Sequence, residues 1–496
     1  TMPRVAEEPA RALRRAWMAA PLHDAVTSVS IERGYELYVV GGAVRDVLLG
    51  RKVYDWDLAG RGVIALAERF AREHSLRAVV LHEDHPTIRV ISRPGDPSGF
   101  LDFVELRAPT IEADLRLRDF TINALAWDIR GAETIVDPTG GLGDLRGSRI
   151  TAPAREVLES DPLRVLRGFR FAAQLHFAIE PQTGQWLAEL APRVQEVAGE
   201  RIGQEMLKLF SARHAADALQ EAEGLGALDA LIPALQAMRG VEQGGFHHLD
   251  VLGHTLLAVH EVERAINEPD LFFPRSADAV RVWLRDPQNR AAVRLATLFH
   301  DVGKPECITH EGGHIRFLGH ADESALTFVD YARHWRLPML LRRQVVRMVR
   351  LHLRPLELAS AALRAEQEGR EIGSVITLRA IRRLMRDAEP AAIGLLLLSV
   401  ADRSACRGPS SRIEQRGRLY DLFDGMLVRY VAWLREMRAH PPLVDGNDLM
   451  QELALEPGPL LGELLDAVHE AQEDGEVSTR QEALALARRL LHDMEQ

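Results

Sequence analysis

Two carboxylates, Asp55 and Asp57, have the residue type and spacing that most clearly indicate chemistry in this sequence. They flank Trp56, and because residues i and i+2 of a β-strand point to the same face, both carboxylates project together. Neighbouring carboxylates repel each other unless a cation lies between them, and oxygen ligands close to phosphate suit Mg²⁺. An isolated Asp-x-Asp is also common as a solvated surface pair, so its surroundings must decide between the two interpretations.

A double glycine, Gly41-Gly42, lies just ahead of this pair, at the end of the apolar run from Leu37 to Val40. An amphipathic segment follows it. We therefore predict a strand that leads into a helix through a turn where backbone N–H groups can approach a phosphate. A phosphate cradle beside a paired-carboxylate metal site is typical of phosphoryl or nucleotidyl transfer.

Two further groups of polar residues need partners or a ligand. Arg118, Asp119 and Asn123 lie in a segment otherwise suited to burial. They offer a fork for phosphate and groups for ribose hydroxyls, and an internal salt bridge with a cap would satisfy them equally. Asp161 and Arg164 are three residues apart in a helical pattern and face the same way. Taken by themselves, they form a helical ion pair.

The elements that must position these residues fall into two classes. Short β-type runs alternate with helical stretches between residues 35 and 150, which predicts an α/β domain. The runs are Glu36–Val40, Tyr54–Ala59, Arg77–Leu81, Thr87–Ile91, Phe100–Leu106 and Ala126–Ile129. Residues Pro94–Gly99 have the composition of a hairpin turn. From about Pro153 onward helical apolar spacing dominates, so the predicted fold class is α+β, an α/β head followed by all-α domains.

Domain boundaries are expected near Ala152–Arg155, Gly224–Gly226 and Arg407–Ser411, where the composition changes. We expect an N-terminal helix over residues 1–30, the head over 31–152 and a helical neck over 153–225. A further helical domain over 226–410 and a helical tail over 411–496 complete the predicted organisation.

The bulk composition excludes several classes of protein. A chain of 496 residues with 46% hydrophobic and 27% charged residues is typical of a multidomain globular protein. No apolar run approaches membrane-spanning length, and the first residues lack a signal-peptide pattern. The two cysteines, Cys307 and Cys406, form neither a disulfide framework nor a metal-ligand spacing, which is typical of a reducing cytoplasm. A net charge of −11 means that RNA contact would require a local basic face.

Residues 38–57 resemble the opening motif of class II tRNA nucleotidyltransferases (the CCA-adding enzymes) and of the related bacterial poly(A) polymerases. The resemblance implies that Asp55 and Asp57 bind catalytic Mg²⁺. It also implies nucleotide binding by Gly41, Gly42, Arg45 and Asp46. For a third carboxylate of the metal site we nominate Asp102, in the strand Leu101-Asp102-Phe103.

Two later segments carry the same resemblance. Residues 114–124 resemble the second motif of the family, which implies that Arg118, Asp119 and Asn123 line the sugar and phosphates; Leu117 stands where the family usually has a second arginine. The segment Asp161-Pro-Leu-Arg164-Val-Leu-Arg167 resembles the base-reading motif, in which the Asp and Arg contact the Watson–Crick edge of the incoming base. Ser160 replaces the family's usual Glu. Residues 200–205 resemble the segment that supports this helix.

A series of histidine and acidic residues follows on predicted helices. Ligands of this kind collected from several helices bind divalent metals, although a lone helical His is more often a core or surface residue. The string His300-Asp301-x-Gly303-Lys304-Pro305, followed by His320 and Glu323, resembles the HD phosphohydrolase domain attached to many bacterial CCA-adding enzymes. The resemblance implies a divalent transition-metal site. Its implied ligands are His254, His300, Asp301 and Asp402, with His320 and His352 completing a second site. Such a set fits a phosphohydrolase, a cyclic phosphodiesterase and a structural metal domain alike.

Taken over residues 35 to 490, the resemblance identifies the chain as a cytoplasmic tRNA 3′-end nucleotidyltransferase that uses Mg²⁺, CTP and ATP. The alternatives are a poly(A) polymerase, which usually lacks an HD domain, and an HD phosphohydrolase with an RNA-binding head. Only six residues, Ala108–Ala113, separate the strand ending near Arg107 from the second motif. CCA-adding relatives carry a longer flexible loop there, which helps to change specificity from C to A. We therefore predict CC addition, with full CCA addition or A addition as alternatives. Arg93–Gly99 is the other segment that could change the specificity from C to A.

Arginines form two clusters against the acidic average. Contacts with tRNA phosphates would explain them, and so would a solvated face with acidic neighbours. The clusters are Arg333, Arg336, Arg342, Arg343, Arg347 and Arg350, and Arg379, Arg382, Arg383 and Arg386. The tail, from Pro442 to Gln472, resembles the C-terminal tRNA-handling region of the same HD-bearing enzymes.

Overall fold

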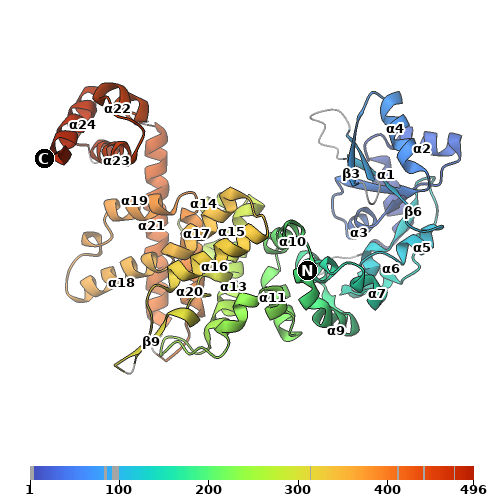
Figure 1. Ribbon diagram of the computed structural model, residues 1–496, viewed down its shortest axis with the longest axis horizontal. Coiled ribbons are helices and arrows are strands. Elements are labelled where there is room, and N and C mark those ends of the chain that lie inside the picture. Colours follow the sequence, from blue (N-terminus) through green and yellow to red (C-terminus); the bar gives the residue numbers. More distant parts are fainter. Residues whose placement is uncertain are drawn as a thin grey trace.

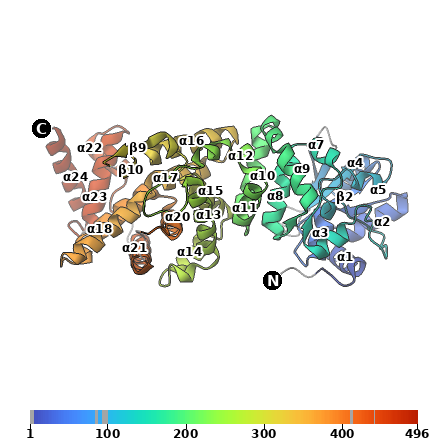
Figure 2. The same ribbon diagram turned by 90° about the horizontal axis from the view of Figure 1, so that it is seen from below.

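A computed structural model describes residues 5–82, 87–91, 100–312, 314–409, 413–439, 442–473 and 475–495. The head, neck, body and tail follow one another along the long axis in chain order (Figures 1 and 2). The head and the tail rise at opposite ends of the helical body, so the molecule is concave on one side (Figure 1). The expected α+β class is confirmed.

The head is built on one six-stranded sheet with the strand order β3-β4-β5-β2-β1-β6. Strands β2 and β5 pair in parallel, and the other neighbours pair in antiparallel fashion. The strands are β1 (Tyr38–Val40), β2 (Asp55–Gly60), β3 (Arg77–His82), β4 (Thr87–Ile91), β5 (Phe100–Glu105) and β6 (Ala126–Asp128). All six predicted strands of the head are present. The expected hairpin turn at Pro94–Gly99 lies outside the described residues.

Alternation along β2 explains why this segment is a strand with one polar face. Trp56 and Leu58 are buried in the core of the head, whereas the side chain of Asp55 is 56% exposed on the other face. The same alternation buries Leu101 and Phe103 of β5 around Asp102. Helix α4 (Val63–Glu73) packs against β3, β4 and β5 with its apolar side.

The segment expected as one helix over residues 1–30 contains two, α1 (Pro9–Met18) and α2 (His23–Arg33). Pro21 separates them, because the residue before a proline is disfavoured in the helical conformation. Trp17 of α1 meets Trp56 of β2 edge-on at 5.4 Å between ring centroids. The N-terminal helices are therefore part of the head.

Helices make up nearly all of the chain beyond the head. The head and neck helices are α3 (Gly42–Leu48), α5 (Ile111–Leu115), α6 (Gly141–Gly147), α7 (Arg155–Glu159), α8 (Leu163–Leu175), α9 (Pro181–Leu190), α10 (Gly199–Ser211) and α11 (Ala215–Gly224). Two short strands, β7 (Arg149–Ile150) and β8 (Ala178–Ile179), pair in parallel and join the head to the neck.

The body packs around α13 (Val251–Asn267) and α20 (Ala392–Ala405), which contact each other extensively. Its other helices are α12 (Leu228–Leu231), α14 (Ala277–Trp283), α15 (Pro287–Phe299), α16 (His320–His334), α17 (Met339–Leu351), α18 (Leu353–Gln367) and α19 (Leu378–Ala388). A hairpin of β9 (Ile308–Glu311) and β10 (His314–Phe317) precedes α16.

The tail forms its own core. Helix α21 (Ile413–Ala439) leads from the body to α22 (Gly446–Leu453), α23 (Pro459–Glu473) and α24 (Arg480–Glu495), whose apolar residues make a cluster separate from that of the body. None of the helices in the described part of the chain is long and apolar enough to cross a membrane.

Candidate active site and metal centres

Three carboxylates converge on the polar face of the head sheet. In the parallel pairing of β2 with β5, Asp57 lies directly beside Asp102, and Asp55 lies two residues earlier on the same face. The nomination of Asp102 is thus consistent with the register, whereas Glu105 faces away and accepts hydrogen bonds from the backbone N–H groups of Gly62 and Val63. Three carboxylates on one face form an oxygen-rich site of the kind Mg²⁺ prefers.

Arg89 of β4 completes this site and was not singled out from the sequence. It lies opposite Asp102 in the antiparallel register and donates Nε to Oδ1 at 2.8 Å and Nη2 to Oδ2 at 2.7 Å. Its Nη2 is also 4.0 Å from Asp55 Oδ2. A charged residue between the apolar Ile88 and Val90 was the available sequence signal, since alternation places it on the polar face.

The electrostatics of the three carboxylates favour a cation. The pKa of Asp57 is raised to about 6, mainly by burial and also by the charges of Asp102 and Asp55, against the opposing effect of Arg118 and Arg89. A carboxyl that ionises with difficulty beside two others is stabilised in its charged form when a divalent ion binds. The residues present therefore fit the Mg²⁺ that the sequence predicted.

The double glycine forms a close approach between the turn and the second motif. Gly41 has φ +67°, and a Cβ at this position would lie 2.9 Å from Arg118 Nη1. Arg118 is held by Asp114, with its Nη2 3.2 Å from Asp114 Oδ2. Because only glycine avoids both the backbone strain and the contact, the turn lets this guanidinium lie against the backbone of Gly41.

The remaining residues of the first two motifs are joined in one buried network. Arg45 pairs with Asp46 and donates Nη1 to Asn123 Oδ1 at 2.7 Å. Asn123 in turn donates to Asp119 Oδ1 at 3.0 Å, and Arg167 of α8 donates Nε to Asp119 Oδ2 at 2.7 Å. Burial opposes ionisation of Asp119, but Arg167 and these hydrogen bonds outweigh it and lower its pKa. Asp119 and Asn123 thus form an internal bridge that ties the head to the neck, and their predicted role in nucleotide binding stays a prediction.

Asp161 and Arg164 differ from the expected helical pair. Helix α8 begins at Leu163, so Asp161 precedes it and accepts the backbone N–H of Leu163 at 3.2 Å. Its other oxygen accepts Arg201 Nη2 at 2.8 Å. Arg164 instead donates Nη1 to the carbonyl of Val157 at 2.7 Å. Pro162 suits the position just before a helix, so it leaves Asp161 outside α8. Separate partners therefore orient the side chains of Asp161 and Arg164.

The sequence also gave no sign of an aromatic centre in this region. The buried ring of Phe171 has three guanidinium groups near it, with Arg170 at 3.8 Å, Arg45 at 5.2 Å and Arg167 at 5.5 Å from its centroid. Glu205 of α10 pairs with Arg170 at 2.5 Å. Burial lowers the pKa of Arg170 to about 10. The segment expected to support α8 thus does so through Glu205 and Arg201.

Four helices and the end of α15 bring the histidine series together in the body. His254 Nε2 lies 3.0 Å from Asp402 Oδ1, and His300 Nε2 lies 3.1 Å from Asp301 Oδ2. The other oxygen of Asp301 faces His320 Nε2 at 3.4 Å and His352 Nε2 at 3.9 Å. The six expected ligands therefore form two adjacent groups, His254–His300–Asp402 and Asp301–His320–His352. Asp301 lies between them, and Lys304 Nζ donates to its Oδ2 at 2.7 Å.

The hydrogen bonds of these histidines fit metal ligation. The Nδ1 atoms of His300, His320 and His352 each lie 2.7 Å from a backbone carbonyl, so they carry the proton and leave Nε2 free to coordinate. Burial lowers the pKa of His352 to about 3, which keeps its imidazole neutral as a ligand must be. His300 Nε2 and Asp301 Oδ1 are buried and face other members of these two groups, as the atoms of a metal site do. Imidazole and carboxylate donors of this kind suit divalent transition metals.

Comparison with known proteins gives these sites their context. The head matches the family model for the poly A polymerase head domain over residues 37–151, and the body matches the HD domain over 253–405. A model for tRNA nucleotidyltransferase domain 2 matches residues 437–487. An A-adding tRNA nucleotidyltransferase of Deinococcus radiodurans is 36% identical over 91% of this chain and 94% of its own. The chain belongs to the tRNA nucleotidyltransferase family.

Other relatives of this nucleotidyltransferase differ in the base they add. A CC-adding tRNA nucleotidyltransferase of Thermus thermophilus is 33% identical over 91% of the chain and 92% of its own. Among solved structures, a Thermotoga maritima CCA-adding enzyme complexed with tRNA shares the fold with a TM-score of 0.56. It is 20% identical and covers 95% of both chains.

The connection between β5 and the second motif of the nucleotidyltransferase is short and closed. Half of the six residues expected as a loop, Ile111–Ala113, belong to helix α5. Thr110 caps this helix by accepting the N–H of Ala113 at 3.3 Å, and Asp114 Oδ1 accepts the N–H of Arg107 at 2.9 Å. The other segment considered as a lever, Arg93–Gly99, lies outside the described residues. A short helix and two hydrogen bonds thus occupy this connection.

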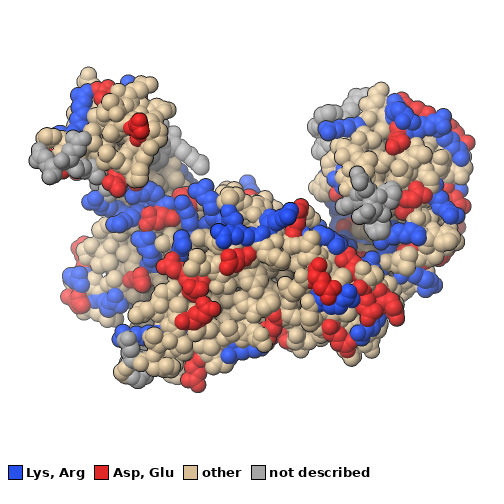
Figure 3. Space-filling model, viewed as in Figure 1, with Lys and Arg blue, Asp and Glu red and all other residues tan. Residues whose placement is uncertain are grey.

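The basic clusters of the nucleotidyltransferase lie at its concave side. Figure 3 shows Lys and Arg side chains gathered along the upper edge of the body, where α17 and α19 lie in Figure 1. Several of these arginines also have acidic neighbours, such as Arg336 with Glu200 at 3.2 Å and Arg350 with Asp322 at 3.1 Å. The basic edge thus faces the space between head and tail.

Proposed function

We propose that this nucleotidyltransferase adds only cytidine to the 3′ end of tRNA and leaves the terminal adenosine to another enzyme. The observation that carries the proposal is the closed connection at Arg107–Asp114. A template that changes from C to A needs a segment that moves it, and this connection is half helix and joined at both ends by hydrogen bonds. A fixed template accepts one base.

The head residues have distinct roles in this proposal. Asp55, Asp57 and Asp102 would hold Mg²⁺, which lowers the pKa of the attacking 3′-hydroxyl and neutralises the leaving pyrophosphate. Gly41, Gly42 and the guanidinium of Arg118 receive the triphosphate. The pair of Arg45 with Asp46 and the network through Asn123 and Asp119 shape the pocket for the sugar. Arg89 balances the acidic charge of the site while the metal is absent.

Base selection is assigned to Asp161 and Arg164. Arg201 and Val157 orient them from opposite sides, so that an acceptor and a donor are presented in a fixed arrangement. Cytosine presents the N4 amine as a donor and N3 as an acceptor, which this arrangement can satisfy. Guanine and uracil present the reverse pattern and would leave both groups unpaired. Arg167 positions the pair through Asp119.

Addition of A alone is the second candidate, because a relative with this activity is 36% identical over nearly the whole chain. Both candidates require a fixed template and differ only in the base that it accepts. Full CCA addition does not share this requirement, because its template must change from C to A.

The experiment is an addition assay on tRNAs ending at the discriminator base, after the first C and after the second C. Each is incubated with Mg²⁺ and with CTP, ATP or both, and the products are sequenced. Addition of two cytidines and no adenosine supports the proposal. Adenosine added only to the CC-ending tRNA shows the A-adding enzyme, and a complete CCA end in one reaction overturns the fixed template. Asp55→Ala is the control and should add nothing in any reaction.

We also propose that the parts divide the work along the chain, within the cytoplasm. Residues 31–152 catalyse, 153–225 select the base, 226–410 form the HD domain and 411–496 hold tRNA. The concave basic edge supplies phosphate contacts. If it does, replacing Arg343 and Arg383 by Ala should weaken tRNA binding and its salt dependence without changing base choice. The exposed Arg61 and Arg69 on the head provide a matched control of two arginines.

For the HD domain we propose metal-dependent phosphohydrolase activity, on the ground that both ligand groups are complete. Asp301 lies between the two groups and would hold ions of both, while Lys304 is placed to contact an anionic substrate or product. The test is hydrolysis of cyclic phosphodiesters and phosphate monoesters with Mn²⁺, Ni²⁺ or Co²⁺. Absence of hydrolysis together with bound metal would show a structural metal domain.

A further inference from the structure

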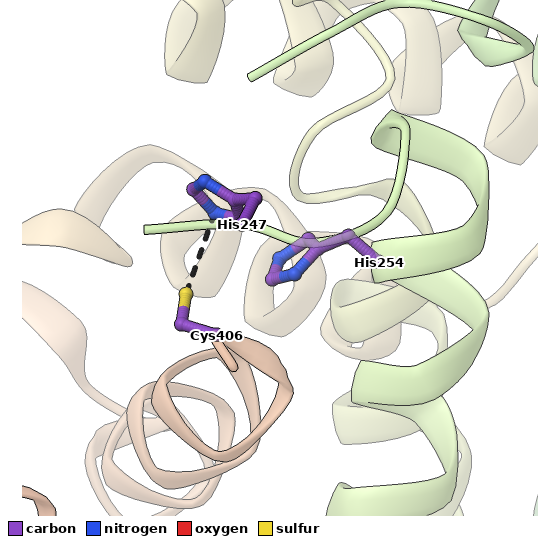
Figure 4. A group of neighbouring side chains, drawn as sticks. All are labelled: His247, His254 and Cys406. Atoms are coloured by element: carbon purple, nitrogen blue, oxygen red, sulfur yellow. Dashed lines mark hydrogen bonds between the residues drawn. The ribbon is translucent and has the colours of Figure 1, made fainter. Parts of the chain in front are cut away.

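A third cluster of metal-ligand residues lies beside the HD groups and contains a cysteine. His247, in the loop before α13, and Cys406, just after the last turn of α20, approach each other with Nε2 and Sγ 3.4 Å apart (Figure 4). The ring of His254, from the first turns of α13, stands edge-on to that of His247 with centroids 4.7 Å apart. A nitrogen of each histidine and the sulfur all lie within 4.8 Å of one another.

These separations match one tetrahedral ion. With metal–nitrogen distances of about 2.0–2.1 Å and a metal–sulfur distance of about 2.3 Å, tetrahedral ligands lie roughly 3.3–3.7 Å apart. The observed 3.4 Å between His247 Nε2 and Cys406 Sγ falls within that range. One pair of ligand atoms therefore already lies at coordination spacing, and the third residue, His254, has a nitrogen within 4.8 Å of both.

Each histidine of this cluster has a buried ring nitrogen without a partner. His254 is 1% exposed; its Nε2 faces Asp402 Oδ1 at 3.0 Å, whereas its Nδ1 has no hydrogen-bond partner within the part of the chain that the structure describes. The Nδ1 atom of His247 is also buried without a partner among the described residues. Buried polar atoms are nearly always paired, so an unpaired Nδ1 of a buried histidine beside a thiol points to a bound cation.

We propose that His247, His254 and Cys406 bind one late first-row divalent cation of the Zn²⁺ type. A thiolate is a soft ligand, so the site selects Zn²⁺ or Co²⁺ over Mg²⁺ and Mn²⁺. Burial raises the pKa of the Cys406 thiol to about 12, so the ion displaces its proton to solvent on binding. The geometry of the three side chains carries this proposal, and it holds whether or not the HD domain hydrolyses a substrate.

The proposed site shares a ligand with the HD groups. His254 belongs to both, and its Nε2 lies 3.0 Å from Asp402 Oδ1. Asp402 lies four residues before Cys406, so the two side chains emerge from the same side of the chain as α20 ends. An ion held by the thiolate would therefore share the His254 ring with the HD centre.

The test is a Co²⁺ titration of the metal-free full-length protein, followed by optical absorption. Cobalt bound to a thiolate gives an intense charge-transfer band in the near ultraviolet, whereas cobalt bound by imidazole and carboxylate alone does not. We expect this band in the wild-type protein and in the Cys307→Ser variant, which serves as the matched cysteine control. It should be absent from Cys406→Ser and weaker in His247→Ala, while the visible bands of the HD-bound cobalt persist. Added Zn²⁺ should remove the band and added Mg²⁺ should not.

Two results would overturn the proposal. One is a wild-type protein that binds Co²⁺ without any charge-transfer band. The other is a band that survives in Cys406→Ser and disappears in Cys307→Ser. Far-ultraviolet circular dichroism of each variant confirms folding, and the wild-type titration decides the question even if Cys406→Ser fails to fold.

Discussion

Replacing Asp57 by Asn should abolish nucleotide addition and yet stabilise the metal-free head at neutral pH. Burial raises the pKa of Asp57 from 3.8 to about 6, so the folded head prefers the neutral carboxyl. Asn reproduces that neutral state in nearly the same volume. The variant therefore removes a charge that costs free energy until a metal ion binds.

The size of the effect follows from the two pKa values. At about 1.4 kcal/mol per pKa unit, the rise from 3.8 to about 6 corresponds to roughly 3 kcal/mol. The stabilising contribution of the neutral carboxyl is fully present below pH 3.8 and is lost as the pH rises through about 6. The advantage of Asp57→Asn should thus be roughly 3 kcal/mol at pH 8 and about half of that at pH 5. Partial exposure of the side chain makes the first figure an upper limit.

The assay is native-state hydrogen exchange of the full-length protein in the presence of a chelator. The free energy of opening is measured for the slowest amides of β2 and β5, in wild type and variant at the same pH. Asp55→Asn is the matched control, because that side chain is 56% exposed and its charge should cost less. Saturating Mg²⁺ should reverse the order, since it binds only the wild-type carboxylates tightly. Equal stability at pH 8, or a difference that does not change with pH, would refute the reasoning.

Three other outcomes are expected. Changing Asp161 and Arg164 together to Ala should relax base choice more than it slows addition, because neither touches phosphate; an equal loss with every nucleotide, in single-turnover assays, would make them structural. Asp301→Ala should remove bound transition metal and any hydrolysis while sparing addition, and loss of both activities would make the HD domain a support for the transferase. Glu205→Gln should destabilise the neck by roughly 3–5 kcal/mol in chemical denaturation, because it leaves the buried guanidinium of Arg170 uncompensated; a change below about 1 kcal/mol would contradict this.

Short-range patterns in the sequence predicted much of the fold and part of the site. Alternation predicts a strand from only a few residues, which is why all six strands of the head were found and why Asp55 and Asp57 were expected on one face. The string around His300 and Asp301 predicted side chains that the structure brings together, and their role as ligands stays a prediction. The prediction of one N-terminal helix was wrong, because the chain breaks into two helices around Pro21.

Only the tertiary structure decided which residues far apart in the chain contact each other. Arg89 meets Asp102 because β4 pairs with β5 in one particular register, and no local pattern specifies a register between strands. Arg45 reaches Phe171 of α8 because α3 and α8 meet at the joint of head and neck. Cys406 and His247 are 159 residues apart and come together only where α20 packs against α13. The spacing of the two cysteines along the chain showed no metal-ligand pattern that would include Cys406. Packing, which depends on side chains all along both helices, places it within reach of two histidines.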